Sequence, residues 1–294
     1  MKGILSMKLA LVRHDGRRAA GFVDTEAGTW QLIEGAQDLG PTGLAELIGR
    51  GDLAGTPAIR KLDEVELLAP IPRPERNVIC IGKNYFEHAE EFGRSGYDAS
   101  AAPGAAQPEK PIFFTKAPSS VVGPGAAIEA HAGLTAELDY EAEVAIVLAR
   151  GGRGIRPEDA YSHIGFYTAA NDVTARDLQR AHRQWFLGKS LDGSCPLGPW
   201  LVSPDEIDVS NTAVSCYVND ELRQQAKLTE LIFDIPTIIA TLSAGLTLQP
   251  GDVILTGTPA GVGIGFTPAR FLVPGDTVRV EVSGVGALVN TVQL

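Results

Sequence analysis

Two glutamates separated by one residue, Glu141 and Glu143, lie in a strongly apolar stretch, DYEAEVAIVL at residues 139–148. Apolar side chains alternate along residues 138–148 as they do in a half-buried β-strand, which places both acids on one face. Their Cα atoms would lie about 6.6 Å apart. Because closely spaced carboxylates repel each other, the pair must face either water or a cation. Taken alone, such a pair is more often simply solvated.

A third acid, Asp172, follows a strand predicted for residues 165–170. Polar residues at the end of a strand commonly carry function. Together with Glu141 and Glu143 it supplies three carboxylates and no soft ligand. Mg²⁺ and Mn²⁺ prefer oxygen ligands of this kind. Magnesium binds about six oxygens and keeps several waters. Three protein carboxylates would therefore leave room for a substrate that chelates the ion.

A histidine and a glutamate share one face of a predicted helix that begins with Asn84 as its cap and ends at Phe92. Glu87 lies three residues after Asn84, which is the spacing of a capping box. His88 and Glu91 are three residues apart, so the carboxylate could orient the imidazole and raise its basicity. An exposed histidine in an acidic helix is the alternative.

Lys189 follows the aromatic residues Trp185 and Phe186, so its ammonium group could be partly desolvated. A surface lysine whose stem packs on apolar neighbours is the alternative. Residues 93–111 are rich in glycine, alanine and proline and lack apolar periodicity. They are predicted to form a mobile loop that could act as a lid.

The elements around these residues predict an α+β, β-rich chain of two domains. Short strand patterns at residues 8–12, 18–23 and 29–33 predict a small N-terminal β-rich domain over residues 1–69. A proline-rich linker is expected at residues 70–76. Residues 77–294 form the larger domain, in which strands dominate; it includes a hairpin at 212–225 and a helix at 235–246.

The composition argues against nucleic acid and membranes as partners. The net charge of −11 provides no basic surface for nucleic acid or for an anionic membrane. No run approaches the ~20 apolar residues of a membrane helix. Three cysteines far apart in the sequence, without a secretory signal, favour a reducing cytoplasm. A soluble cytoplasmic protein with a small-molecule substrate is expected.

Three common catalytic patterns are not present in the sequence. The glycines at 261, 263 and 265 do not have dinucleotide-binding spacing, and a proline follows where a helix should begin. The chain contains no Gly-x-Ser-x-Gly motif. Zinc-type histidine and cysteine spacings are also missing. An oxygen-ligand metal site remains the best-supported centre.

Five motifs, taken together and in order, resemble the fumarylacetoacetate hydrolase family. They are GKNY (82–85), YEAE (140–143), NDVTARD (171–177), GKS (188–190) and GDVILTGTP (251–259). The resemblance covers residues 77–294, and the N-terminal domain resembles the variable cap of longer bacterial members.

The resemblance implies a mixed β-sandwich roll, a homodimer, and one divalent metal ion, Mg²⁺ or Mn²⁺, in each subunit. It also implies roles for individual residues: metal ligands Glu141, Glu143 and Asp172; catalytic residues His88, Glu91 and Lys189; and substrate-binding residues Arg176, Gln179, Lys116, Ser119 and Thr258.

Several activities fit this resemblance. The first expectation is hydrolysis of a carbon–carbon bond in a 2,4-dioxo acid, with pyruvate released and His88 and Glu91 activating water. The alternatives are decarboxylation or keto–enol tautomerisation of oxaloacetate, or decarboxylation or isomerisation of an oxo-dicarboxylate from aromatic degradation. The segments RQWFLGK (183–189) and CPLGP (195–199) look closest to members with proposed oxaloacetate chemistry. A non-catalytic, metal-stabilised binding protein is the remaining alternative.

Overall fold

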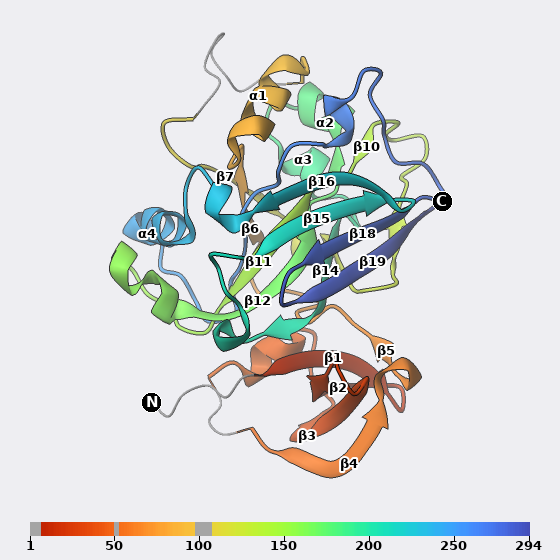
Figure 1. The fold of residues 1–294 in the computed structure, drawn as a ribbon, viewed down its shortest axis with the longest axis vertical. Helices are drawn as coiled ribbons and strands as arrows, with labels where there is room; N and C mark the ends of the chain where they lie inside the picture. The colour runs from red at the N-terminus through yellow and green to blue at the C-terminus, as the bar shows by residue number, and fades with distance from the viewer. Residues whose placement is uncertain (1–6, 50–52, 98–107) are drawn as a thin grey trace.

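A computed structural model describes residues 7–49, 53–97 and 108–294, and its fold is α+β and rich in strands (Figure 1). The largest sheet has the strand order β4-β3-β2-β1-β14-β12-β11-β17-β6-β7, with β5 beside β1 and β8 beside β14. Its strands are β1 (Lys8–His14), β2 (Arg17–Asp24), β3 (Thr29–Gln37), β4 (Gly55–Lys61), β5 (Glu66–Leu67), β6 (Val78–Gly82), β7 (Ile112–Lys116), β8 (Val121–Val122), β11 (Ala142–Leu148), β12 (Ile164–Asn171), β14 (Cys195–Val202) and β17 (Val253–Leu255).

A second sheet packs over the first and has the order β16-β15-β18-β19-β9 (Figure 1). Its strands are β9 (Ala127–Glu129), β15 (Ala213–Val218), β16 (Glu221–Lys227), β18 (Thr277–Val282) and β19 (Gly286–Gln293). Two short strands, β10 (Leu138–Asp139) and β13 (Thr174–Ala175), pair separately. The α-helices are α1 (Phe86–Arg94), α2 (Arg176–Ala181), α3 (Phe186–Lys189) and α4 (Ile235–Gly245).

The three N-terminal strand predictions are confirmed by β1, β2 and β3. These strands extend the large sheet, because β1 pairs antiparallel with β14 through Lys8 with Val202 and Leu9 with Leu201. The domain boundary at residues 70–76 stays a prediction. Residues 98–107 of the predicted lid loop lie outside the described residues.

The central strand differs from the sequence prediction in two ways. The predicted strand at 138–148 is interrupted at Tyr140 and Glu141, which separate β10 from β11. Every residue of β11 is buried, so the strand is not half-buried. Val144 and Ile146 pack into one hydrophobic cluster, whereas Ala145 and Val147 pack into another. Both faces are covered, and the acids at this end of the strand are therefore removed from water.

The predicted Asn84 cap is wrong. Helix α1 begins at Phe86 with Tyr85 at its N-cap position, and it continues past Phe92 to Arg94. The Asn84 amide instead donates to the carbonyls of Phe233 and Thr256 and accepts from the Phe233 N–H. Because this side chain is committed to distant backbone groups, it fixes the chain just before α1.

Other local predictions are confirmed. Helix α4 occupies the predicted segment, and Asp234 accepts a hydrogen bond from the Thr237 N–H at its start. Asn219 and Asp220, with φ of 50° and 65°, form the turn of the β15–β16 hairpin.

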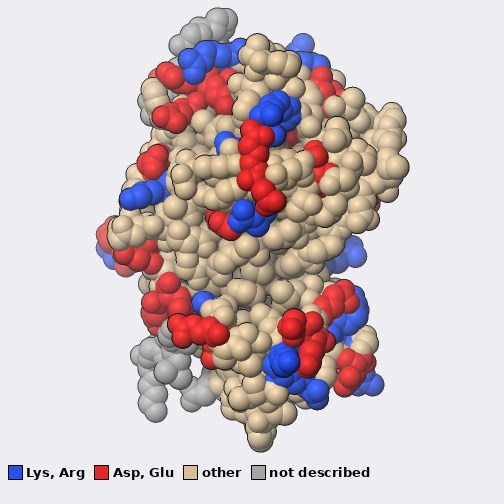
Figure 2. Space-filling model, turned by 45° about the vertical axis from the view of Figure 1, so that its right-hand side comes forward, with Lys and Arg blue, Asp and Glu red and all other residues tan. Residues whose placement is uncertain are grey.

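Within the described residues, no helix is long and apolar enough to cross a bilayer. On the face shown in Figure 2, acidic and basic side chains lie in small mixed groups.

Candidate metal centre and active site

Three carboxylates meet at one end of the β11–β12 strand pair. Glu141 precedes β11, Glu143 lies in β11, and Asp172 follows β12. The antiparallel register pairs Ala142 with Asn171, so the three acids converge although 31 positions separate the first from the last. One oxygen from each lies within 4.8 Å of the others. All three side chains are buried.

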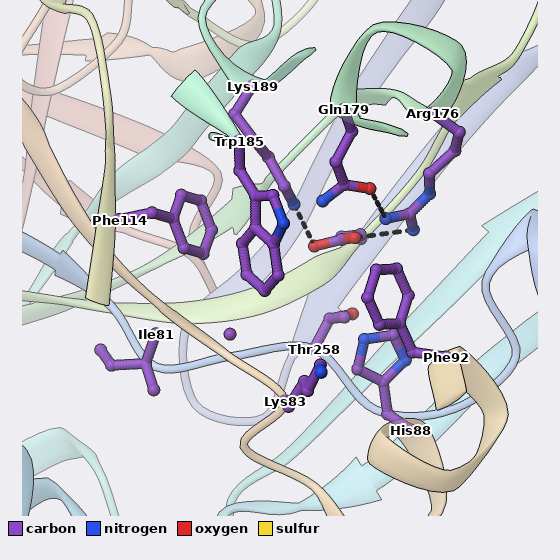
Figure 3. Close-up of a pocket in the computed structure, with 12 residues that line it drawn as sticks. Ile81, Lys83, His88, Phe92, Phe114, Arg176, Gln179, Trp185, Lys189 and Thr258 are labelled. Carbon is purple, nitrogen blue, oxygen red and sulfur yellow. Dashed lines mark hydrogen bonds and ion pairs between the residues drawn. The ribbon is translucent and has the colours of Figure 1, made fainter. Parts of the chain in front are cut away.

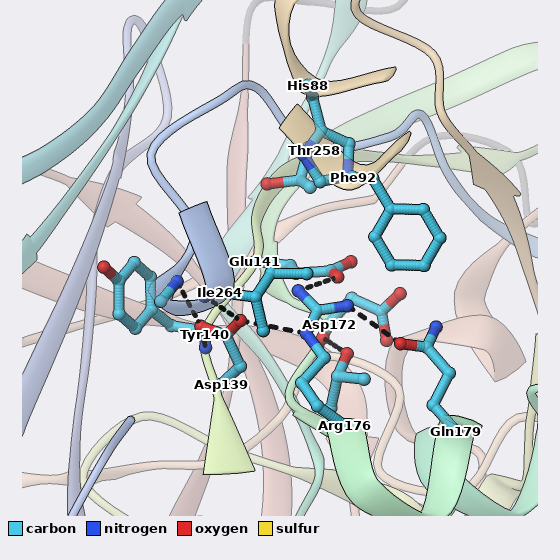
Figure 4. A network of polar contacts seen from close by, with 12 residues as sticks. His88, Phe92, Asp139, Tyr140, Glu141, Asp172, Arg176, Gln179, Thr258 and Ile264 are labelled. Atoms are coloured by element: carbon cyan, nitrogen blue, oxygen red, sulfur yellow. Dashed lines mark hydrogen bonds and ion pairs between the residues drawn. The ribbon is translucent and has the colours of Figure 1, made fainter. Parts of the chain in front are cut away.

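Backbone groups hold these acids in place, and Figure 4 shows Glu141 and Asp172 beside the Arg176 side chain. The Asp172 N–H donates to the Glu141 carbonyl at 2.8 Å, and the Glu141 N–H donates to the Asn171 side-chain oxygen at 3.0 Å. The Gly257 N–H donates to Glu143 Oε2 at 2.5 Å. A side chain at position 257 would collide with Asn84, and φ there is +104°, so glycine is required for this approach.

Two buried lysines are bound to the carboxylates. Lys189 Nζ donates to Glu141 Oε2 at 2.7 Å and to Asp172 Oδ2 at 2.8 Å. Lys116 Nζ donates to Asp172 Oδ1 at 2.7 Å. The ammonium of Lys116 is wholly buried and holds a carboxylate of the cluster, and the residue does not line the pocket where a substrate-binding role was expected.

The charges of these residues suit a bound cation. Burial alone would raise the pKa of Glu141, but the neighbouring Lys189 and Arg176 lower it to about 2. Burial, together with Asp172 and Glu141, raises the pKa of Glu143 well above its usual value. None of the ion pairs found among the described residues includes Glu143. A divalent ion with a preference for oxygen ligands would neutralise this acid, so the donor set fits Mg²⁺ or Mn²⁺.

Arg176, at the start of α2, connects the carboxylates to the pocket wall. Its Nε donates to Asp139 Oδ2 at 2.9 Å, and its guanidinium forms an ion pair with Glu141 at 2.7 Å. It also donates to Gln179 Oε1 at 3.1 Å. Because the amide oxygen of Gln179 is occupied, its amide nitrogen faces the pocket (Figure 3).

His88 lies on α1 above the carboxylates and is 4% exposed. Its Nδ1 is 3.2 Å from Glu91 Oε2, as the shared helix face predicts. Glu91 Oε1 also accepts the Gly261 N–H at 3.0 Å, which ties α1 to the loop after β17. A Cβ at Gly265 would lie 1.8 Å from Glu91, so glycine there makes room for this contact.

The pocket is closed by aromatic rings (Figure 3). Trp185 contacts Phe92 of α1 and Phe114 of β7, with ring centroids 5.9 and 5.3 Å apart. The cavity measures about 10 Å³, which is room for roughly one water molecule. Its lining includes His88, Glu141, Arg176, Gln179, Lys189 and Thr258 from the predicted set, and Ile81, Gly82, Lys83, Phe92, Phe114 and Trp185 besides.

Two predicted substrate-binding residues have different positions. The Thr258 hydroxyl lines the pocket, donates to the Ala142 carbonyl at 3.0 Å and accepts from Gln224 at 2.8 Å. Ser119 is exposed and lines a separate surface pocket with Glu129 and Asp192. It lies in a short 3-10 turn after β7 and is not brought to the metal centre.

Sequence reasoning did not single out Asp139 or Lys83. Asp139 accepts from the Gly263 and Ile264 N–H groups as well as from Arg176, so it organises the Arg176 side of the site. Its only sequence signal was its place two residues before Glu141. Lys83 was read as part of a turn, and nothing in its spacing indicated that it faces the pocket.

Comparison with known proteins agrees with this geometry. Residues 77–293 match the family model described as fumarylacetoacetate (FAA) hydrolase C-terminal. The oxaloacetate tautomerase YisK of Bacillus subtilis is 48% identical over 79% of this chain and 74% of its own length. The human mitochondrial oxaloacetate tautomerase FAHD2A is 39% identical over 83% of this chain and 75% of its own length.

Among solved structures, the fumarylacetoacetate hydrolase from the psychrophile Exiguobacterium antarcticum superposes with a TM-score of 0.81. It is 42% identical, and the match covers 98% of this chain and 99% of that one. A 5-carboxymethyl-2-hydroxymuconate delta-isomerase from Mycobacterium smegmatis gives a TM-score of 0.77 at 32% identity, over 98% and 99% of the two chains. The chain belongs to the fumarylacetoacetate hydrolase family.

Proposed function

We propose that this protein is a divalent-metal-dependent enzyme that interconverts the keto and enol forms of oxaloacetate. The observation that carries the proposal is the convergence of three buried carboxylates, Glu141, Glu143 and Asp172, at a pocket that Glu141 lines together with His88. Similarity to two oxaloacetate tautomerases supports this reaction over hydrolysis, which was the first expectation from the sequence.

Glu141, Glu143 and Asp172 would hold Mg²⁺ or Mn²⁺, which when bound would supply a Lewis acid for the 2-oxo group and its neighbouring carboxylate. Lys189 carries a positive charge beside two of these acids, and its contacts with Asp172 and Glu141 help to raise its pKa although burial opposes this. Its ammonium group is therefore available to stabilise negative charge that develops on the substrate oxygen.

His88 would move the proton. Tautomerisation takes a proton from C3 of the keto form and places one on the C2 oxygen, with no other atom gained or lost. Glu91 accepts the Nδ1–H of His88, which leaves Nε2 as the acceptor in the neutral ring. An imidazole fixed in this tautomer can take up a proton at Nε2 and return it.

The pocket wall would position the substrate and exclude water. The Gln179 amide nitrogen and the Thr258 hydroxyl provide uncharged polar contacts. Phe92, Phe114 and Trp185 close the cavity, and its small volume means that α1 must move for oxaloacetate to be admitted. Once α1 returns, the reacting atoms are shielded from solvent.

Carbon–carbon bond hydrolysis is the second candidate. It is favoured by the similarity over almost the whole chain to the Exiguobacterium hydrolase, and by the His88–Glu91 pair, which could orient a water molecule as well as a substrate proton. Decarboxylation of oxaloacetate needs the same electron sink without the water. The homodimer and the cytoplasmic location stay predictions.

Product analysis separates these reactions. Oxaloacetate, acetylpyruvate and fumarylpyruvate are each incubated with protein and Mg²⁺ or Mn²⁺, with chelated samples as controls. A tautomerase accelerates enol–keto exchange of oxaloacetate without releasing pyruvate. Metal-dependent pyruvate release from an acylpyruvate would establish hydrolysis instead, and release from oxaloacetate with CO₂ would establish decarboxylation. Metal stabilisation without turnover of any compound would indicate a binding protein.

A further inference from the structure

Gln224 is a buried amide on β16, the strand at one edge of the second sheet, and it is 1% exposed. The register of β15 and β16 passes from Cys216 with Gln224 to Tyr217 with Leu222, so Arg223 is an extra residue in β16. Bulges of this kind change the direction of nearby side chains and are frequent beside active sites. Leu222 faces solvent, whereas Gln224, two positions later, is turned into the protein.

The hydrogen bonds of Gln224 fix the orientation of its amide. Its Oε1 accepts the Ala142 N–H at 3.0 Å, and its Nε2 donates to the Pro259 carbonyl and to the Thr258 hydroxyl, both at 2.8 Å. A backbone N–H can only donate and a carbonyl can only accept, so the flipped amide is excluded. The Thr258 hydroxyl donates in turn to the Ala142 carbonyl at 3.0 Å. Gln224, Ala142 and Thr258 therefore form a closed ring of hydrogen bonds.

These two side chains bind the backbone of β11 where its neighbouring strand has ended. β17 pairs with β11 at residues 145–147, and the first N–H after β17 donates to the Val144 carbonyl at 3.0 Å. The polar groups of alternate residues in a strand point to the same side, so those of Ala142 point the same way as those of Val144. The Gln224 amide and the Thr258 hydroxyl supply the partners that a longer β17 would have supplied.

Ala142 lies between two of the three acids of the metal centre. Its N–H belongs to the peptide group that joins it to Glu141, and its carbonyl belongs to the peptide group that joins it to Glu143. Because a peptide group is planar, Gln224 holds the plane beside the first acid and Thr258 holds the plane beside the second. The angle between these planes sets how far apart the two carboxylates lie, and Mg²⁺ demands near-ideal octahedral geometry from its ligands.

We propose that Gln224 is a positioning residue of the metal centre, which keeps Glu141 and Glu143 at the spacing that a divalent ion needs. The inference rests on the metal site of the proposed function. Gln224 is not one of the residues that line the pocket, so it acts through Ala142 and not by contact with substrate. Residues that hydrogen-bond behind metal ligands commonly contribute about 10- to 100-fold to metal affinity.

A role limited to joining the two sheets would have a different result. It would change the free energy of unfolding of the metal-free protein and leave the metal affinity of the folded protein as it was. Metal affinity is therefore the measurement that separates the two roles.

The test measures the Kd of Mn²⁺ by calorimetry for the unaltered protein, Gln224→Met and Gln225→Met. Methionine keeps the approximate volume of glutamine and lacks its hydrogen bonds. Gln225 is the matched control, because it is the next residue of β16 and is exposed. Gln224→Met raises the Kd about 10- to 100-fold, whereas Gln225→Met leaves it within about twofold. An unchanged Kd in Gln224→Met would overturn the proposal, even if the Tm of the metal-free variant were lower.

Variants of Thr258 test the same ring from its other side. Thr258→Ser keeps the hydroxyl and retains the Mn²⁺ affinity within about threefold, whereas Thr258→Val weakens binding. Since both side chains hold one segment, Gln224→Met combined with Thr258→Val weakens binding by less than the product of the two single losses. Losses that multiply fully would contradict the shared ring.

Two further outcomes are separable. If Gln224→Met does not fold, as circular dichroism would show, Gln224→Asn is measured in its place, because its shorter side chain cannot bond both segments and the same loss is expected. If enol-oxaloacetate is not turned over but Mn²⁺ affinity depends on Gln224, the proposed reaction fails while the positioning role stands.

Discussion

Glu91 binds His88 Nδ1 through one carboxylate oxygen and the Gly261 N–H through the other. The same side chain therefore orients the imidazole and fastens α1 across the pocket. Glu91→Ala removes both contacts and should lower kcat by about 10- to 100-fold, less than the roughly 100- to 10,000-fold contribution of a general base itself, because Glu91 only orients the imidazole.

Glu90 provides the matched control for that change. It is on the same helix, and its ion pair with Arg94, at 3.6 Å, lies at the surface. Glu90→Ala should leave kcat within about twofold, as expected for an exposed pair. Equal rates for Glu91→Ala and Glu90→Ala would remove Glu91 from the mechanism.

Glu143→Gln tests the metal site without relying on turnover. The substitution removes a ligand, so the Mg²⁺-dependent rise in Tm should disappear and metal affinity should fall by at least roughly 100-fold. Because burial and two neighbouring acids raise the pKa of Glu143, the metal-free variant should be at least as stable as the metal-free parent. Thermal denaturation with increasing Mg²⁺ measures both effects.

Glu158→Gln is the corresponding surface control, since Glu158 is exposed. It should retain the full response of Tm to Mg²⁺. A Glu143→Gln protein that is still stabilised by Mg²⁺ as strongly as this control would contradict the ligand assignment.

The elements of the site were predictable to different degrees. Alternation along 138–148 predicted the strand and the common direction of Glu141 and Glu143, because a strand repeats every two residues. It could not show that both faces of β11 are buried, since that depends on the second sheet and on the N-terminal strands. Asp172 was predicted from its place after a strand, and the register of β11 and β12 supplies the physical reason for the convergence.

Long-range contacts explain where the structure differs from the local expectations. Asn84 has the residue type of a helix cap, but Phe233 and Thr256 compete for its amide. Lys116 was expected to contact substrate, whereas it is paired with Asp172 beneath the pocket. Ser119 is close to Lys116 in sequence, yet the turn between them directs it to another surface pocket. None of these outcomes is encoded in local spacing.

Trp185 should report the opening of the pocket. It packs against Phe92 of α1, whereas Trp200 donates its N–H to the Val285 carbonyl and Trp30 is buried in the N-terminal strands. Movement of α1 would expose Trp185 to water, so ligand binding that holds α1 closed should shift tryptophan emission to shorter wavelength. Trp185→Phe should abolish the shift, and Trp200→Phe should preserve it. A shift that survives Trp185→Phe would place the movement elsewhere.

Buried thiols should make stability fall at alkaline pH. Burial, followed by the charge of Asp139, raises the pKa of Cys216 above the ordinary value of 9.0, and burial raises that of Cys195 to about 12. Above about pH 9 the unfolded chain therefore loses protons that the folded chain keeps, and the free energy of unfolding decreases. Tm should decline between about pH 8 and pH 10.5, and Cys216→Ala should reduce the slope. A constant Tm over this range would contradict the burial of these groups.

The rate at which enol-oxaloacetate disappears is the most direct test of the proposed reaction. It can be followed by ultraviolet absorbance immediately after the enol is dissolved, with Mg²⁺ present or chelated, for the parent protein and His88→Gln. We predict a metal-dependent acceleration that falls by about 100-fold or more in His88→Gln, without pyruvate release. A decay rate equal to that of buffer with Mg²⁺ alone, for the folded and metal-bound parent protein, would contradict the assignment.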